Sequence, residues 1–310
     1  MGGIFYQIAR STRPVQWLKN LALFAALVFS GSLLIQEKFL ETVWAVVVFS
    51  LLTSSVYIFN DIVDFENDRL HPFKKFRPIA SGKLPIPIAF FVLIILVSIS
   101  LYFAIGLSFF FFLTCLLYLI SQILYSLSLK SYVIFDVLII AGGFFLRAAA
   151  GAFVIGVHLS GWFYLCVISL SLFLAVGKRR SELSILAEKA GEYRKTLSLY
   201  SAPLLDGYLA MFGASAFLSW SLFTFFAPPP PVSQIFPILA HLPLTIAGIN
   251  KLLMATIPVV IYGIMRYQKI IYEGARAESP ERVLLSDKPL LTAALLWGVM
   301  VVGIIYGVQE

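Results

Sequence analysis

The longest uncharged stretch of this sequence constrains its fold most. No Asp, Glu, Lys or Arg occurs between Lys83 and Lys130. Because a helix needs about 20 apolar residues to cross the hydrocarbon core of a bilayer, this stretch is long enough for two crossings joined by a turn near Gly106. Only 13% of all residues are charged, against about 25% in a typical soluble domain. The chain is therefore predicted to be a polytopic membrane protein, and not a soluble domain with an apolar core.

The apolar runs predict nine membrane-spanning helices in an all-α bundle, which would form one domain over residues 1–310. The expected spans are 16–36, 41–62, 86–105, 107–128, 134–156, 161–178, 203–227, 249–271 and 289–308. Residues 232–248 are apolar but interrupted by prolines. We interpret them as a re-entrant or interfacial segment.

The charge of the connecting segments alternates from one end of the predicted bundle to the other. Most Lys and Arg residues fall in the segments at about 60–85, 129–133, 178–202 and 272–288. The positive-inside rule places these segments in the cytoplasm, which predicts a multi-pass protein of the inner (plasma) membrane. The net charge of +7 follows from this bias, so no nucleic-acid partner is expected.

One charged segment is distinctive because its acidic residues are regularly spaced. Asp61, Asp64 and Asp68 stand at i, i+3 and i+7, which places them on one face of a helix. Three neighbouring carboxylates repel one another, and Mg²⁺ would relieve this repulsion because it binds carboxylate oxygens together with substrate phosphates. Asn60 adds an amide oxygen. We therefore predict a Mg²⁺ site at these four residues, with ordinary solvated loop carboxylates as the alternative.

Basic residues follow these acids closely. Within ten residues of Asp68 come Arg69, His71, Lys74, Lys75 and Arg77. Arg binds phosphate through its planar fork and Lys acts as a point charge. The combination predicts a phosphorylated substrate, with Lys74 and Arg77 among its ligands. For the single lysines, the alternative is an ordinary positively charged cytoplasmic loop.

Arg147 stands inside the apolar fifth span. An isolated Arg there costs at least about 2.5–3.5 kcal/mol on insertion scales, so an anionic partner is expected. That partner is either a substrate phosphate or, in a structural ion pair, Asp136 or Glu66.

Three further lysines and arginines stand at the ends of spans. Lys178 and Arg179 end the sixth span, and Glu182 shares a helix face with Lys178. Lys19 lies near the start of the first span. Each of these cations is either a phosphate ligand or an anchor of membrane topology.

The segment NDIVDFEND (60–68) resembles the N-D-x-x-D-x-x-x-D signature of the UbiA superfamily of intramembrane prenyltransferases. The resemblance runs over nearly the whole chain. It implies nine helices, an active-site cavity that faces the cytoplasm, and Mg²⁺ held by this motif on a diphosphate. Most of the superfamily has a second motif, commonly D-x-x-x-D. The matching segment here, YSLSLKSYVIFD (125–136), offers Tyr125, Lys130 and Asp136 but no acid pair, so a second carboxylate-held Mg²⁺ loses support.

Four other segments resemble one branch of that superfamily, the decaprenyl-phosphate phosphoribosyltransferases. They are RPVQWLKN (13–20), HPFKKFRPIASG (71–82), GGFFLRAAAGA (142–152) and GKRRSEL (177–183). The resemblance implies transfer of 5-phosphoribose from phosphoribosyl diphosphate (PRPP) to a polyprenyl (decaprenyl) phosphate, with release of diphosphate, for cell-envelope arabinan biosynthesis. Prenyl transfer from a prenyl diphosphate to an aromatic acceptor is the alternative within the superfamily. A transporter or lipid-binding protein is the alternative outside it.

The expected roles follow from these patterns and from the resemblance. Catalytic roles are assigned to Asp61, Asp64, Asp68, Lys130 and Lys178. Substrate binding is assigned to Lys19, Asn60, Lys74, Arg77, Tyr125, Arg147, Lys178, Arg179 and Glu182. The acceptor phosphate is already an anion, so the site needs no strong general base. The polyprenyl tail is expected in a groove between helices in the lipid bilayer, and a homo-oligomer is compatible with the sequence.

Overall fold

The structure is a computed structural model that describes residues 3–71, 73–186, 199–227, 249–273 and 280–306. Within these ranges every regular element is a helix, and no strand occurs. The chain divides into two compact units, each of which is described by itself. Unit 1 holds the described residues up to 158 together with Leu199, and unit 2 holds the others. The interfacial segment expected at 232–248 lies outside the described residues.

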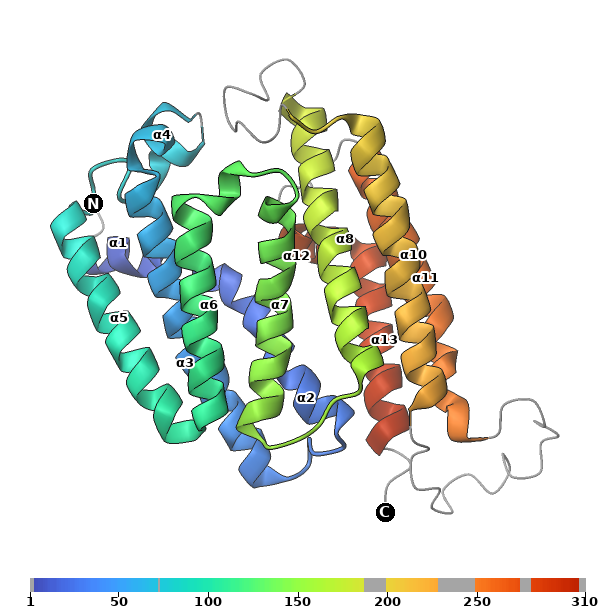
Figure 1. The fold of residues 1–310 in the computed structure, drawn as a ribbon. Coiled ribbons are helices and arrows are strands. Elements are labelled where there is room, and N and C mark those ends of the chain that lie inside the picture. Colours follow the sequence, from blue (N-terminus) through green and yellow to red (C-terminus); the bar gives the residue numbers. More distant parts are fainter. Residues whose placement is uncertain (1–2, 72, 187–198, 228–248, 274–279, 307–310) are drawn as a thin grey trace. The chain divides into compact units, whose positions relative to one another are not determined.

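Unit 1 is built around one long helix, α3. Its elements, with η for 3₁₀ helices, are α1 (Ile4–Ser11), η1 (Pro14–Leu23), α2 (Phe24–Phe29), α3 (Gln36–Val63), α4 (Phe65–Leu70), η2 (Lys74–Phe76), α5 (Ile86–Leu107), α6 (Phe109–Leu127), η3 (Leu129–Ser131) and α7 (Phe135–Val154). α3 packs against α5, α6 and α7, and α6 lies between α5 and α7 (Figure 1). The turn between α5 and α6 falls at Ser108, where the backbone is extended, two residues beyond the expected Gly106.

Unit 2 contains two pairs of packed helices. Its elements are α8 (Gly161–Leu186), α10 (Ala202–Phe226), η6 (Ile249–Thr256), α11 (Ile257–Tyr272), α12 (Pro280–Ser286) and α13 (Lys288–Tyr306). α8 packs along α10, and α11 packs against α13. A Cβ added to Gly177 would lie 2.7 Å from the side chain of Ile271, so the glycine allows α8 and α11 to approach closely.

Seven of the described helices are long and apolar enough to cross a membrane: α3, α5, α6, α7, α8, α10 and α13. The multi-pass class expected from composition is thus supported by seven of the nine expected spans. The other two are divided. The range 16–36 contains η1 and the 6-residue α2, and the range 249–271 contains η6 and the 16-residue α11. Neither α-helix reaches the roughly 17–25 residues of a complete span.

The two divided spans differ in the local structure at the point of division. α11 begins at Ile257 with Pro258 in its first turn, where a residue without an N–H is tolerated, whereas it would break a helix interior. In unit 1, the carbonyl oxygen of Leu23 lies only 2.1 Å from the position that a Cβ of Gly151 would occupy. This close approach joins the end of η1 to α7, a contact that apolar periodicity does not predict.

The sixth expected span is longer than the sequence indicated. α8 continues past residue 178 to Leu186, so the segment GKRRSEL is helical and does not begin a loop. Lys, Arg, Glu and Leu all have high helix propensity. Glu182 also lies one turn from Lys178 and Arg179. Its Oε1 is 3.9 Å from Lys178 Nζ and its Oε2 is 2.6 Å from Arg179 Nη1, and these ion pairs support the added turns.

Candidate active site

The three regularly spaced aspartates lie at a break between two helices. α3 ends at Val63 and α4 begins at Phe65, and Asp64 between them has φ −90° and ψ 8°. Asp61 on α3 and Asp68 on α4 are each 2% exposed. The helix that the spacing implies is thus interrupted at Asp64. The main chain nevertheless keeps helical spacing, because Asp64 N donates to Asn60 O (2.9 Å) and Asp68 N donates to Asp64 O (2.8 Å).

Four cations contact these carboxylates. Arg77 bridges two of them: its Nη1 lies 3.0 Å from Asp61 Oδ1 and 2.5 Å from Asp68 Oδ2. Arg13 also donates to Asp61, and Lys130 donates to Asp64. Lys74 Nζ lies 4.0 Å from Asp68 Oδ1. We call this set the carboxylate–cation cluster; its members are Arg13, Asp61, Asp64, Asp68, Lys74, Arg77 and Lys130.

The cluster is accessible from its basic side. The side chains of Arg13, Arg77 and Lys130 are 24–25% exposed, whereas those of Asp61 and Asp68 are almost fully buried. An anionic molecule that enters from solvent would therefore meet the cations first. The arrangement suits a ligand whose total negative charge is greater than that of the three carboxylates.

Arg13 carried no expected role in the site. It precedes η1 with φ 52°, a left-handed backbone that is uncommon for a residue other than glycine. Such conformations cost about 1–3 kcal/mol and cluster at functional sites. The guanidinium lies 5.1 Å from the ring centroid of Tyr57 as well as against Asp61. Only its place in the segment RPVQWLKN could have indicated this position.

The segment where a second acid pair would be expected contributes a cation instead. Lys130 lies in η3, between α6 and α7, and pairs with Asp64. Near the end of α6, Ser126 donates to Asn60 Oδ1 at 3.2 Å, and Tyr125 beside it is half-buried. The end of α6 thereby supports the end of α3.

Arg147 forms a second polar centre inside unit 1. It is 5% exposed. Its Nε donates to Asn20 Oδ1 (2.9 Å), its Nη1 to Gly143 O (2.8 Å) and its Nη2 to Tyr118 Oη (2.9 Å). Lys19, another expected ligand, lies next to Asn20 on η1 and is half-buried.

The partners of Arg147 are all neutral. Across the described ranges, no carboxylate pairs with its guanidinium, and its ring contacts are to Phe49, Tyr118 and Phe144. Of the two alternatives for Arg147, the structural ion pair with Asp136 or Glu66 is therefore wrong. Hydrogen bonds and ring faces stabilise the cation, and no carboxylate of the described residues cancels its positive charge.

The remaining expected ligands belong to unit 2. They are Lys178, Arg179 and Glu182. Arg179 is completely buried and binds Glu182. Lys178 Nζ lies 3.9 Å from Glu182 Oε1, so the expected pairing of these two residues on one helix face is present. A neighbouring ion pair was not predicted from the sequence. Arg180 Nε lies 2.7 Å from Asp206 Oδ1, and the hydroxyl of Tyr272 donates to the same oxygen at 3.0 Å.

His71 organises the basic loop after α4. Its Nδ1 accepts the backbone N–H groups of Phe73 (3.2 Å) and Lys74 (3.3 Å). Burial, with a further contribution from the nearby Lys74 ammonium, lowers the pKa of His71 below its ordinary value. The neutral ring can therefore act as an acceptor that shapes the loop carrying Lys74 and Arg77.

The oxygen donors of the cluster suit Mg²⁺. Asp61, Asp64, Asp68 and the amide oxygen of Asn60 are hard ligands of the type that Mg²⁺ prefers. In the part of the chain that the structure describes, no three His, Cys, Asp or Glu side chains form a complete metal site. Mg²⁺ commonly uses one or two carboxylates plus substrate phosphates. The donor set therefore fits an ion that binds together with an anionic substrate.

Known proteins resemble this chain over most of its length. The family described as "UbiA prenyltransferase family" matches residues 20–254. A decaprenyl-phosphate phosphoribosyltransferase of Corynebacterium glutamicum is 33% identical, over 96% of this chain and 86% of its own. One of Mycobacterium tuberculosis is 31% identical, over 94% and 91%. The solved structure of a UbiA homolog from Archaeoglobus fulgidus bound to GPP and Mg²⁺ has a TM-score of 0.67 and 21% identity, and the match covers 96% of this chain and 99% of that chain.

Proposed function

Because the chain belongs to the UbiA prenyltransferase family, we propose that it transfers 5-phosphoribose from PRPP to a polyprenyl phosphate such as decaprenyl phosphate. Diphosphate is the leaving group. The relatives from Corynebacterium glutamicum and Mycobacterium tuberculosis bear the name of that activity. A place for the product in cell-envelope arabinan biosynthesis is part of the proposal and rests on the resemblance of the four sequence segments alone. The observation that carries the proposal is the carboxylate–cation cluster of unit 1.

The charge balance of the cluster favours PRPP over a prenyl diphosphate. PRPP carries a 5-phosphate in addition to its diphosphate, so its site needs more cations than carboxylates. The cluster has four cations and three carboxylates. Lys130 supplies a positive charge in the segment where a second acid pair would bind a second metal ion. The presence of a cation there, in place of an acid pair, supports a donor with more than one phosphate group.

Within the cluster, substrate binding is an exchange of ion-pair partners. Arg13 and Arg77 present planar guanidinium groups that suit phosphate oxygens, and Lys130 presents a point charge. When these cations turn to phosphates, the carboxylates of Asp61 and Asp64 become available to a metal ion. Asp68 is placed either to complete that ligand set or to accept a hydrogen bond from a ribose hydroxyl.

The reaction needs charge stabilisation more than proton transfer. Displacement at the anomeric carbon passes through an oxocarbenium-like state while negative charge builds on the departing diphosphate. Mg²⁺ held by Asn60 and the three aspartates would supply Lewis-acid neutralisation of that charge. The acceptor phosphate is already anionic and requires no general base. Lys178 and Arg179 are further candidate phosphate ligands on the resemblance of GKRRSEL alone.

A groove of about 270 Å³ between η1 and α3 suits the polyprenyl tail. It begins at Pro14, the neighbour of Arg13, and its walls include Trp17, Leu21 and Val47. An apolar chain lying here would have its phosphate end near the cluster. We propose this groove as the start of the acceptor lipid's path.

The membrane topology of the proposal has nine crossings. The two divided segments, η1–α2 and η6–α11, would complete the set with the seven long helices. The cluster then lies at the cytoplasmic end of α3, in line with the basic connecting segments. Single cysteines at exposed Lys83 and Phe109 test this orientation: a membrane-impermeant thiol reagent should reach Lys83→Cys in inside-out vesicles and Phe109→Cys in right-side-out vesicles.

The deciding experiment offers the purified full-length protein two donor–acceptor pairs. One pair is labelled PRPP with decaprenyl phosphate, and the other is labelled prenyl diphosphate with an aromatic acid. We expect Mg²⁺-dependent product only from the first. Asp61→Asn and Asp64→Asn should abolish it, whereas Glu66→Gln, which alters an exposed acid of the same motif, should not. Product from the second pair alone would identify an aromatic prenyltransferase, and near-normal turnover in both Asp variants would remove the metal role.

A further inference from the structure

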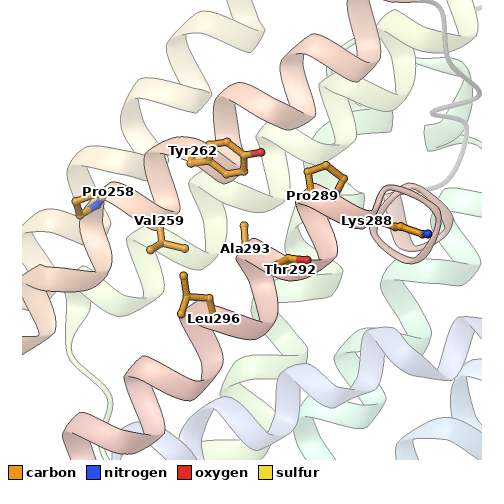
Figure 2. A pocket seen from close by; sticks show the side chains of 8 residues that line it. All are labelled: Pro258, Val259, Tyr262, Lys288, Pro289, Thr292, Ala293 and Leu296. Atoms are coloured by element: carbon orange, nitrogen blue, oxygen red, sulfur yellow. The ribbon is translucent and has the colours of Figure 1, made fainter.

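Unit 2 contains a groove whose lining residues have no part in the proposed transfer reaction. It is an open groove of about 570 Å³ between α11 and α13 (Figure 2). That volume falls within the range of about 300–1,000 Å³ typical of small-molecule sites. The groove belongs entirely to unit 2, whereas the carboxylate–cation cluster belongs to unit 1. A separate ligand must therefore be considered.

The two ends of this groove differ in polarity. Pro258, Val259 and Leu296 make one end apolar. Toward the other end, Figure 2 shows the polar atoms of Tyr262, Thr292 and Lys288 directed to the same side. A ligand that matches this arrangement has a long apolar part and an anionic or strongly hydrogen-bonding head.

The polar atoms at that end are available to a ligand. Among the described residues, the Lys288 ammonium forms no hydrogen bond or ion pair, and the hydroxyls of Tyr262 and Thr292 form no hydrogen bond. The two cations of α11, by contrast, are paired: Arg266 Nη2 lies 2.7 Å from Asp287 Oδ2, and Lys269 Nζ lies 3.4 Å from Glu273 Oε1. Lys288 thus provides a positive charge at the mouth of an apolar groove, with no carboxylate partner among the described residues.

We propose that this groove binds an anionic phospholipid of the bilayer. Its phosphate contacts Lys288, with the Tyr262 and Thr292 hydroxyls as donors, and one acyl chain follows the apolar wall toward Pro258. Basic pockets between membrane helices are known to hold anionic head groups. Tyr262 and Leu296 are 48% and 50% exposed, so the groove opens sideways to surrounding lipid. That lateral opening favours a bulk membrane lipid over a substrate enclosed for reaction.

The test measures lipid retention by the full-length protein. The protein is reconstituted in vesicles of phosphatidylglycerol or phosphatidylcholine, extracted in mild detergent and analysed by native mass spectrometry. Wild type should keep phosphatidylglycerol in preference to phosphatidylcholine. Lys288→Gln should lower phosphatidylglycerol occupancy about fivefold, the effect of one lysine near an anionic lipid surface. Lys269→Gln, which removes an exposed lysine of α11 outside the groove, should leave occupancy unchanged.

A second variant separates shape from charge. Thr292→Trp fills the groove at an exposed position and keeps the net charge, and it should also lower occupancy. Elution volume and melting temperature identify any variant that has lost its fold. The proposal is overturned if Lys288→Gln retains as much phosphatidylglycerol as wild type. It is also overturned if a folded Thr292→Trp does so, or if decaprenyl phosphate occupies the groove while phosphatidylglycerol does not. Because the readout is binding, the outcome is independent of whether PRPP is the donor of the transfer reaction.

Discussion

Arg13 and Asp61 stand 48 positions apart in the sequence, yet their ion pair joins the N-terminal segment to the end of α3. The aspartate is buried and the arginine is about one quarter exposed. Asp61 accepts from Arg77 as well. One carboxylate therefore holds two guanidinium groups close together, an arrangement that suits the oxygens of a phosphate group.

Replacing Arg13 should impair catalysis more than folding. Arg13→Gln removes one charge while Arg77 still neutralises Asp61. We expect kcat/KM for the transfer reaction to fall about 10- to 100-fold, since a charge-assisted hydrogen bond contributes roughly 1.5–3 kcal/mol. Arg10→Gln, at an exposed cation of α1, is the matched control. An equal loss of kcat/KM in both variants would mean that the effect comes from general surface charge.

The neutral partners of Arg147 lead to a second expectation. Arg147→Ala should raise the Michaelis constant for a phosphorylated substrate about tenfold, because it removes the uncancelled positive charge. Asn20→Ala should lower only the melting temperature. A double-mutant cycle should give a stability coupling of about 0.5–3 kcal/mol, as for residues in direct contact. Unchanged kinetics in Arg147→Ala would make this arginine purely structural.

Two glycines of α7 form a matched pair for packing. Gly151→Ala places a Cβ 2.1 Å from Leu23 O, so the backbone of η1 or α7 must move. Such overpacking costs about 1–3 kcal/mol or more, and the melting temperature should fall by about 5 °C or more. Gly142→Ala meets no atom within 4 Å and should keep or slightly raise stability, because alanine favours helix. Equal effects would mean that η1 does not pack on α7.

Asp287 gives an expectation for pH. The hydrogen bond from the Arg266 guanidinium, with that from Leu290 N–H, holds the pKa of Asp287 below its ordinary value of 3.8. A carboxylate whose pKa is lower in the folded state stabilises the protein above the ordinary value, and this contribution is lost as the pH falls through the folded-state pKa.

The measurement compares melting temperatures of wild type and Asp287→Asn between pH 7 and pH 3. Wild type should be the more stable at pH 7, and the difference should shrink below about pH 4. Asparagine can still accept from Leu290 N–H through its amide oxygen, so the variant removes the charge and one of the two hydrogen bonds with Arg266 but keeps the backbone contact. Glu273→Gln, at an exposed pair with Lys269, should show little change with pH. If the difference in melting temperature between wild type and Asp287→Asn stays constant down to pH 3, titration of Asp287 is not its source.

Local features of the sequence were enough to find part of the site. Asp61, Asp64 and Asp68 could be recognised because helical spacing depends only on neighbours in the chain, and the cations that follow them are just as local. Arg13 could not be found in this way. Its role depends on a left-handed backbone and on a contact across 48 positions, and neither leaves a periodic signal.

Prediction of the fold was limited in the same way to features that depend on local sequence. Long apolar runs predicted α5 and α6 to within two residues, because desolvation of a helix depends on composition and length. The division of the first span depends on tertiary contacts such as the approach of Leu23 to Gly151. Arg147 illustrates the point for polar groups: its charge suggested a substrate phosphate or a carboxylate as partner, whereas the protein groups that surround it are an amide, a carbonyl and a phenol.

The pairing of Asp64 with Lys130 also sets an order for biogenesis. Lys130 follows Asp64 by 66 positions, and at roughly 5–20 residues per second it leaves the ribosome roughly 3–13 s later. Because α5 and α6 lie between the two residues in the chain, the pair can close only after both of these helices have been synthesised.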